Sequence, residues 1–189
     1  MENPLAVIDA CCAINLLATG REVEIVRANG MTLLRSDRVR AETINLWTPP
    51  DERGQRRKEH ASNARLQDAG LLATREMDTD ELIDAFVTAA ERIKDADASC
   101  IALAGVLKLP LITDDAKERR IARQLFPTVE LVSTLHLVHE AARILSWSDC
   151  DSVEVARSLW WRGNFAPPRD DPYRSWYIEL LASGGIVCP

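Results

Sequence analysis

Short apolar runs alternate with amphipathic stretches along most of this chain, and this alternation limits its possible folds more than any other feature. The pattern is typical of a parallel β-sheet covered by helices, because buried strands read as apolar runs and the connecting helices as amphipathic stretches. The sequence predicts strands at residues 5–9, 31–34, 71–77, 111–113 and 129–132. We therefore expect an α/β fold in which a central parallel sheet is flanked by helices.

Hydrophobic spacing and capping residues predict the helices between these strands. The expected helices lie near residues 10–19, 21–29, 36–48, 79–90, 97–107, 115–126, 133–145, 153–161 and 173–182. Pro49 and Pro50 should end the third of them. The polar segment 51–67 predicts a mobile loop that leads into a solvated helix. With 189 residues, 47% of them hydrophobic, the chain can bury one ordinary core.

The five cysteines are odd in number and include no Cys-x-x-Cys pair, which argues against a disulfide framework or a zinc site. Cys11, Cys12 and Cys100 lie in apolar segments, so we expect them in the core of a reduced protein. No apolar stretch is long enough to span a membrane, and no basic region precedes the first apolar run. We expect a soluble, cytoplasmic protein.

The formal net charge of −6 speaks, at first, against a nucleic-acid partner. Basic residues nevertheless gather in segment 35–65 and again after residue 115, where Arg119, Arg120 and Arg123 follow one another closely. Carboxylates that hold a metal ion would also make a nuclease look more acidic than its binding face. RNA is therefore not excluded, and these three arginines are the candidate contacts to its phosphates. The arginines at 53–58 are more typical of a solvated loop.

Four acidic residues that are far apart in the sequence each stand beside an apolar segment. Asp9 and Asp115 end predicted strands, while Glu42 and Asp97 lie near the first turns of predicted helices. Since ligands of parallel α/β sheets bind beyond the carboxyl ends of the strands, we expect these four carboxylates to converge there. Clustered carboxylates repel one another unless a divalent cation neutralises them, and oxygen ligands without histidine favour Mg²⁺ or Mn²⁺. The sequence therefore predicts a magnesium or manganese site that handles phosphates.

Each of these acids also has a plainer interpretation. An aspartate before a helix often serves only as its N-cap, and a glutamate on a helix is usually solvated. Two neighbouring acids, Asp95 and Asp114, are secondary candidates for metal ligands. His60, His136 and His139 share no ligand pattern with the acids.

The acids belong to four motifs in a fixed order. They are Val7-Ile8-Asp9-Ala10-Cys11-Cys12-Ala13-Ile14-Asn15-Leu16-Leu17, Val39-Arg40-Ala41-Glu42, Asp97-Ala98-Ser99-Cys100-Ile101-Ala102-Leu103-Ala104 and Leu111-Ile112-Thr113-Asp114-Asp115. This ordered set resembles the PIN-domain ribonucleases, especially the toxin nucleases of VapBC-type toxin–antitoxin modules. The resemblance covers roughly residues 5–132. The chain departs from the family at Cys11 and Cys12, where the family usually has Ser or Thr.

The resemblance implies a PIN-like three-layer fold, with a nuclease domain at residues 1–135. Residues 136–189 lie outside the resemblance, and we expect them to form a helical carboxyl-terminal extension packed on the same domain. The resemblance also implies an endoribonuclease in which Asp9, Glu42, Asp97 and Asp115 hold Mg²⁺ or Mn²⁺. Water activated there would attack an RNA phosphodiester and leave 5′-phosphate and 3′-hydroxyl ends. Asn15 and Thr113 would support the site. Toxin-type relatives are commonly dimers paired with an antitoxin, so an antitoxin partner and a homo-oligomer are expected on the resemblance alone.

Other function classes remain open or fit poorly. A non-catalytic PIN-like module that binds RNA or protein would keep the same fold and carboxylates. A phosphotransfer receiver domain needs an acidic neighbour for Asp9 and a lysine near the last strand, and this chain has neither. A haloacid-type phosphatase needs an aspartate where the chain has Cys11. The aromatic residues of the carboxyl-terminal region favour core packing or an oligomer contact, with an antitoxin or RNA bases as alternatives.

Overall fold

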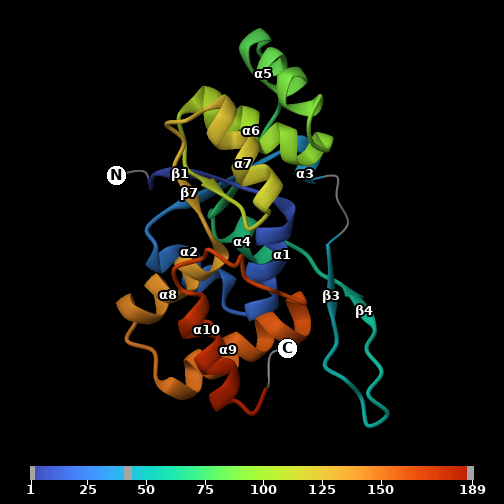
Figure 1. Ribbon diagram of the computed structural model, residues 1–189, viewed down its shortest axis with the longest axis vertical. Helices are drawn as coiled ribbons and strands as arrows, with labels where there is room; N and C mark the ends of the chain where they lie inside the picture. The colour runs from blue at the N-terminus through green and yellow to red at the C-terminus, as the bar shows by residue number, and fades with distance from the viewer. Residues whose placement is uncertain (1–2, 41–43, 187–189) are drawn as a thin grey trace.

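A five-stranded parallel sheet forms the centre of the molecule, as the sequence predicted (Figure 1). The structure, a computed structural model, describes residues 3–40 and 44–186. The strands of the sheet lie in the order β5 (Leu72–Arg75), β2 (Thr32–Ser36), β1 (Leu5–Ile8), β6 (Leu111–Ile112) and β7 (Leu131–Val132). Strand order reverses at β1, because β2 and β5 extend to one side of it and β6 and β7 to the other. The carboxyl ends of β1 and β6 therefore flank the crevice where such sheets bind ligands.

Helices cover both faces of the sheet. Successive side chains of β1 point to opposite faces, so this strand packs against both helical layers. Val7 packs into the core formed with α5 (Asp80–Ala90), α6 (Asp95–Leu107) and α7 (Ala116–Leu125). Ile8 packs into the opposite core, formed with α1 (Ala10–Thr19), α2 (Glu22–Ala28) and α8 (Thr134–Ile144). The fold is thus a three-layer α/β arrangement, consistent with the PIN-like fold expected.

The carboxyl-terminal helices belong to the second of these cores. They are α9 (Asp149–Ser158), a π-helix at Leu159–Gly163 and α10 (Arg174–Ser183). Leu159, Tyr177 and Leu181 are buried in the same cluster as Ile8 and the α1 residue Leu16. The domain boundary predicted between residues 135 and 136 lies within α8. The helices of this extension lie beside α1 in Figure 1, where they form the lower part of the molecule.

The helix predicted near residues 36–48 was wrong at residues 45–47, which form a strand. Helix α3 spans Asp37–Arg40, and β3 (Asn45–Trp47) pairs antiparallel with β4 (Lys58–His60). Apolar and aromatic residues at 44–47 suit a half-buried strand, and Leu46 is buried against α1. The predicted loop therefore contains the second half of a hairpin, which projects beside the C-terminal helices in Figure 1. The solvated helix expected after it is α4 (Ala64–Asp68).

The turn of this hairpin is held by Asp51. The Asp51 carboxylate accepts hydrogen bonds from the backbone N–H groups of Arg53 and Gln55, at 2.9 and 2.8 Å. Gly54 adopts a φ of 72° in this turn, a conformation that favours glycine. Local side-chain hydrogen bonds of this kind define a turn without help from the protein core.

Cysteine placement agrees with the sequence at two positions of the three. Cys12 and Cys100 are buried, whereas Cys11 is exposed on the first turn of α1, so the expectation of a core position was wrong for Cys11. The described cysteines Cys11, Cys12, Cys100 and Cys150 are all free thiols. Among residues 3–40 and 44–186, we find no helix with the length and apolar character that crossing a bilayer requires.

Candidate functional site

Asp9 lies at the carboxyl end of β1 and is almost completely buried, with 2% of its surface exposed. Its side chain caps α1 by accepting a hydrogen bond from the backbone N–H of Cys12 at 2.5 Å. Burial raises the pKa of Asp9 from 3.8 to about 6, and the negative charge of Asp114 adds to this rise. A carboxyl group that serves only as a helix cap is normally exposed and acidic, so the burial of Asp9 indicates a further role.

Glu118 is a second buried acid at this site, and the sequence analysis missed it. It lies in the first turn of α7, where Thr113 Oγ1 donates a 2.7 Å hydrogen bond to its Oε2 atom. Its Oε1 atom is buried and has no hydrogen-bond partner in the part of the chain that the structure describes. Burial raises the pKa of Glu118 well above its usual range, and the charges of Asp9 and Asp97 raise it further.

The sequence did contain a signal for Glu118. It shares one face of α7 with Ile121, Ala122 and Leu125, at spacings of three, four and seven residues. Ile121 and Ala122 are buried, so an acid in line with them must also enter the interior. A buried acid is rarely kept without a partner or a function.

Asp97 and Asp95 lie in the first turn of α6, and the structure separates their surroundings. Asp97 is partly buried and close enough to Glu118 to raise its pKa. Asp95 is exposed, and its Oδ2 atom lies 3.8 Å from the guanidinium of Arg38. Asp97 is thus the acid that joins Asp9 and Glu118, which is the choice that the sequence favoured.

The adjacent acids Asp114 and Asp115 also differ. The Asp114 carboxylate accepts hydrogen bonds from Asn15 Nδ2 at 3.1 Å, from Cys12 Sγ at 3.2 Å, and from the backbone N–H and hydroxyl of Thr134 at 3.0 and 2.5 Å. Both of its oxygens are therefore occupied by donors of the protein. Asp115 is exposed and caps α7 by accepting from the N–H of Glu118 at 2.8 Å.

The two supporting residues predicted from the sequence lie at this site. Thr113 is buried just after β6, where its hydroxyl donates a hydrogen bond to Glu118. A hydrogen bond from Thr113 to Asp9 also lowers the pKa of Asp9. Asn15 reaches Asp114 rather than Asp9. The fourth predicted ligand, Glu42, lies outside the described residues.

Of the three arginines predicted to contact RNA, only Arg119 touches the site. Its Nη1 atom donates a 3.1 Å hydrogen bond to the backbone carbonyl of Thr113. The Arg119 Nε atom is buried without a hydrogen-bond partner among the residues described. Arg120 and Arg123 are exposed on α7. Arg119 thus brings one positive charge beside the acids, while the other two stay in solvent.

Asp9, Asp97 and Glu118 together form what we call the acid cluster. It lies where β1 and β6 end and α1, α6 and α7 begin, and the helix amino termini partly offset its negative charge. The donor chemistry suits a hard divalent cation, and no described group donates a hydrogen bond to the buried Glu118 Oε1. However, among residues 3–40 and 44–186 no three Asp, Glu, His or Cys side chains are arranged as a metal cage. Mg²⁺ fits such a site, because it commonly binds one or two carboxylates and keeps several waters.

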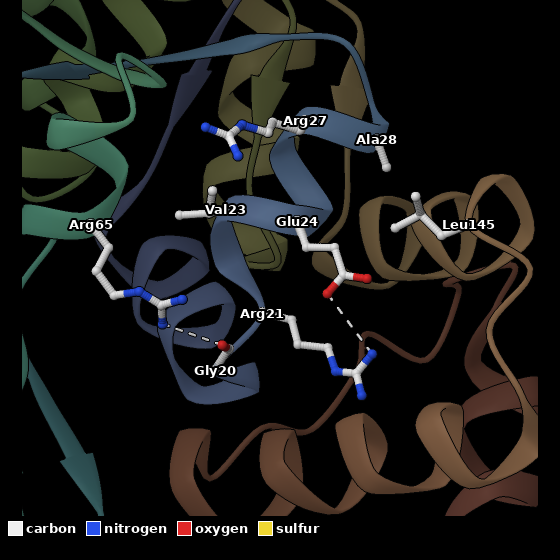
Figure 2. A pocket seen from close by; sticks show the side chains of 8 residues that line it. All are labelled: Gly20, Arg21, Val23, Glu24, Arg27, Ala28, Arg65 and Leu145. Atoms are coloured by element: carbon white, nitrogen blue, oxygen red, sulfur yellow. Dashed lines mark hydrogen bonds and ion pairs between the residues drawn. The ribbon is translucent and has the colours of Figure 1, made fainter.

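A surface hollow lies elsewhere, on α2 between α4 and the end of α8 (Figure 2). It encloses about 450 Å³, and its polar side chains mostly bind other parts of the protein. Arg65 pairs with the buried Glu22 at 2.9 Å and approaches the Gly20 carbonyl, and Arg21 pairs with Asp151 at 2.6 Å. We therefore place the candidate site at the acid cluster and not in this hollow.

Comparison with known proteins adds no family assignment, because neither the protein-family models nor the curated proteins include a match to this chain.

Proposed function

We propose that the protein is a Mg²⁺- or Mn²⁺-dependent endoribonuclease. One observation carries this proposal: Asp9, Asp97 and Glu118 are brought together at the switch point of a parallel sheet, with the pKa values of Asp9 and Glu118 raised. Buried acids that repel one another are expected where a cation completes the site. The resemblance of the four sequence motifs to PIN-domain ribonucleases supports RNA as the substrate.

The side chains of the acid cluster have distinct roles in this proposal. Asp9 and Glu118 would hold the ion together with Asp97, and Glu42 stays a predicted ligand. A bound Mg²⁺ or Mn²⁺ supplies a Lewis acid and lowers the pKa of coordinated water. Thr113 fixes Glu118 by its hydrogen bond, and Asp114 joins the ends of β6, α1 and α8. Burial raises the pKa of Glu118, and an ion binds the carboxylate form, so ion binding would release any proton that Glu118 holds.

RNA cleavage with and without EDTA tests the activity. We expect chelation to abolish cleavage and Mn²⁺ to restore it, and we expect Asp9→Asn to reduce the rate at least about 100-fold. Asp95→Asn is the matched control, because Asp95 is exposed and faces Arg38. Cleavage that survives both EDTA and Asp9→Asn would exclude this mechanism.

A second candidate function is a non-catalytic PIN-like module that binds RNA or protein. The absence of a ready three-ligand metal group among the described residues favours it. Titration calorimetry with Mn²⁺ in two buffers of different ionisation enthalpy distinguishes the candidates. An ion that displaces the Glu118 proton gives a heat that depends on the buffer, whereas a non-catalytic module without an ion gives no binding heat.

An antitoxin partner and a homo-oligomer belong to the same proposal, since both rest on the toxin-type resemblance, and the cytoplasmic location expected from the apolar segments agrees with it. Expression of the chain in a bacterial host tests the toxin role. We expect growth arrest that the neighbouring reading frame relieves, and no arrest by the Asp9→Asn variant.

A further inference from the structure

Two surface hollows lie beside Trp161 of the π-helix, and this residue lines both of them. The larger hollow encloses about 600 Å³ between Trp161, one face of α9 and the hairpin residues Pro49 and Pro50. The smaller hollow encloses about 300 Å³ between Trp161, Trp160 and the hairpin residue Arg56. Trp161 is only half-buried. It therefore borders open space in two places, unlike a tryptophan that only fills a core.

The charged side chains around the two hollows are mostly positive. Arg157 and Arg162 line the larger hollow and Arg56 the smaller one, and Glu154 is the one acid among the described residues that line them. Glu154 already has a basic neighbour outside the hollows, because its carboxylate lies 3.8 Å from the guanidinium of Arg21. The lining residues therefore present a positive surface to a ligand.

The arginines keep their charge available although two of them bind the protein. Arg162 donates to the backbone carbonyl of Ala18 at 3.3 Å, and Arg56 donates to the backbone carbonyl of Trp161. These acceptors are neutral, so they hold each guanidinium in place without cancelling its charge. Arg157 is exposed on α9. The acids of the hairpin turn lie elsewhere, since they line a separate hollow at the turn.

The hairpin also places positive charge directly on aromatic rings. The Arg56 guanidinium lies 5.7 Å from the ring centre of Trp161 and 5.0 Å from that of Trp47, and the Lys58 ammonium lies 5.2 Å from the Trp47 ring. Glu59 points to the opposite face of the hairpin from Lys58, because successive residues of a strand alternate. Proteins that bind single-stranded nucleic acids combine aromatic rings with basic side chains in this manner.

The π-helix packs on α1, the helix that Asp9 caps. A Cβ atom at Gly163 would lie 3.2 Å from Oδ1 of Asn15 and 3.3 Å from the Cβ atom of Ala18. The same Asn15 side chain donates a hydrogen bond to Asp114 beside the acid cluster. Along α1, Asn15 follows Asp9 by only about 9 Å, at 1.5 Å per residue. A strand bound at the acid cluster can therefore continue along α1 to the hollows.

We propose that Trp161 is a base-stacking platform for single-stranded RNA, and that Arg56 and Arg157 bind phosphates of the stacked segment. A nucleic acid strand uses both features of this surface, because its bases are flat and apolar and the links between them are anionic. Stacking accepts every base, so the platform adds affinity without selecting a sequence. That the strand is also the substrate of the acid cluster rests on the proposed function, whereas the stacking chemistry rests on the ring and its arginines.

Anisotropy of fluorescein-labelled oligouridine with the full chain in EDTA tests the platform without metal-dependent cleavage. We expect Trp161→Leu to raise Kd about tenfold, the usual order for the loss of one base–aromatic stack. Arg157→Gln should reduce the slope of log Kd against log salt by about 0.7, the value for one phosphate contact on a single strand.

A second labelled strand, in which tetrahydrofuran abasic residues replace the bases, separates stacking from other effects. Trp161→Leu should leave its Kd unchanged within about twofold, because this strand has no base to stack. Arg157→Gln should weaken both strands alike, because both keep their phosphates. The ring and the arginine thus have different signatures in one assay.

Trp147→Leu is the matched control, since Trp147 also lies beside an arginine, with Arg21 at 5.1 Å, but lines neither hollow. Thermal unfolding is recorded for every variant, and the exposed Arg157 keeps the test decisive if Trp161→Leu fails to fold. In that case an unchanged Kd and salt slope for Arg157→Gln would overturn the proposal.

Folded Trp161→Leu with an unchanged Kd for oligouridine, or with equal losses for both strands, would overturn the platform even if the protein cleaves RNA. The hollows would then suit a partner protein better than RNA. Conversely, a loss confined to the strand with bases, in a protein that cleaves nothing, would retain the platform and reject the nuclease.

Discussion

At the residue scale, the raised pKa of Asp9 makes the metal-free protein sensitive to pH. The unfolded chain ionises Asp9 near pH 3.8, while the folded protein keeps its proton up to about pH 6. The folded state therefore binds more protons in this window, and the free energy of unfolding falls as pH rises through it. We expect Asp9 to account for a loss of about 2 kcal/mol between pH 4 and pH 7. Urea unfolding in EDTA across this range measures it.

Asp9→Asn is the comparison that isolates this effect, because other groups titrate in both proteins. The difference in unfolding free energy between the variant and the parent should grow in favour of the variant as pH rises from 4 to 7. Asp115→Asn should follow the parent, since Asp115 is exposed. If the unfolding free energies of the parent and Asp9→Asn change equally with pH, ionisation of Asp9 does not destabilise the folded protein.

Glu118→Gln should separate stability from activity. Burial raises the pKa of Glu118 well above its usual range, which favours the neutral carboxyl, and glutamine matches that form in size. The Thr113 hydroxyl can still donate to the amide oxygen. We expect unfolding free energies in EDTA at pH 7 to agree within about 1 kcal/mol, while RNA cleavage falls at least about 100-fold. A strong loss of stability with cleavage retained would mean that Glu118 is a structural residue.

The sequence identified Asp9 and Asp97 because each follows or opens a strongly patterned element. It preferred Asp115 to Asp114, whereas the structure leaves Asp115 exposed and binds Asp114 to Thr134 of α8, a residue that is remote in sequence. Glu118 was missed because it resembles a solvated helix residue until its face is compared with Ile121 and Ala122. Packing between residues that are distant in sequence determines the surroundings of Asp114, Asp115 and Glu118, and local sequence patterns do not reveal such packing.

At the scale of elements, strands with a continuous apolar run were predictable and the hairpin was not. β1 and β6 are buried on both faces, so their composition alone reveals them. β3 and β4 have three residues each, and β4 is exposed throughout. The spacing of Val39, Ile44 and Leu46 also suits a helix, and the choice of strand depends on pairing with residues 58–60. Short segments of this kind take their structure from their partner.

Gly105 in α6 gives a prediction in which helix propensity and packing disagree. Propensity favours Gly105→Ala by about 1 kcal/mol. A Cβ atom at Gly105, however, would lie closer than 3.0 Å to the Phe126 ring, which packs against α6 just after α7. Overpacking costs about 1–3 kcal/mol, and the rigid ring near its point of attachment has little freedom to move. We expect Gly105→Ala to lower the unfolding free energy by about 1–2 kcal/mol, measured by urea unfolding.

The double variant Gly105→Ala/Phe126→Ala supplies the control. Removing the ring removes the clash, so the two changes should not be additive. In the Phe126→Ala background, Gly105→Ala should be neutral or stabilising. Destabilisation of equal size in both backgrounds would rule out the Phe126 contact as its cause.

At the scale of the whole molecule, the carboxyl-terminal region completes the core on one face of the sheet. The sequence recognised helices and aromatic residues there, and core packing was one of the interpretations. The structure buries Phe165 and Tyr177 in the same cluster as Ile8 and Leu16. It also connects the extension to the hairpin, because Arg56 donates to the backbone carbonyl of Trp161 and lies over the rings of Trp47 and Trp161. No local pattern predicts contacts between residues that are so distant in sequence.

A chain that ends after Ser146 should therefore fail to fold cooperatively. The shortening removes Leu159, Tyr177 and Leu181 from the core and leaves the apolar face of α1 uncovered. Each large side chain lost from a core costs about 2–5 kcal/mol, and a domain of this size is stabilised by only about 5–15 kcal/mol. We expect no cooperative thermal transition by circular dichroism, with aggregation in size-exclusion chromatography. Leu159→Ala in the full chain, which should cost about 2–5 kcal/mol, tests the same contact without shortening. A sharp transition in the shortened chain would instead identify residues 1–146 as an independent domain, to which the later helices are only attached.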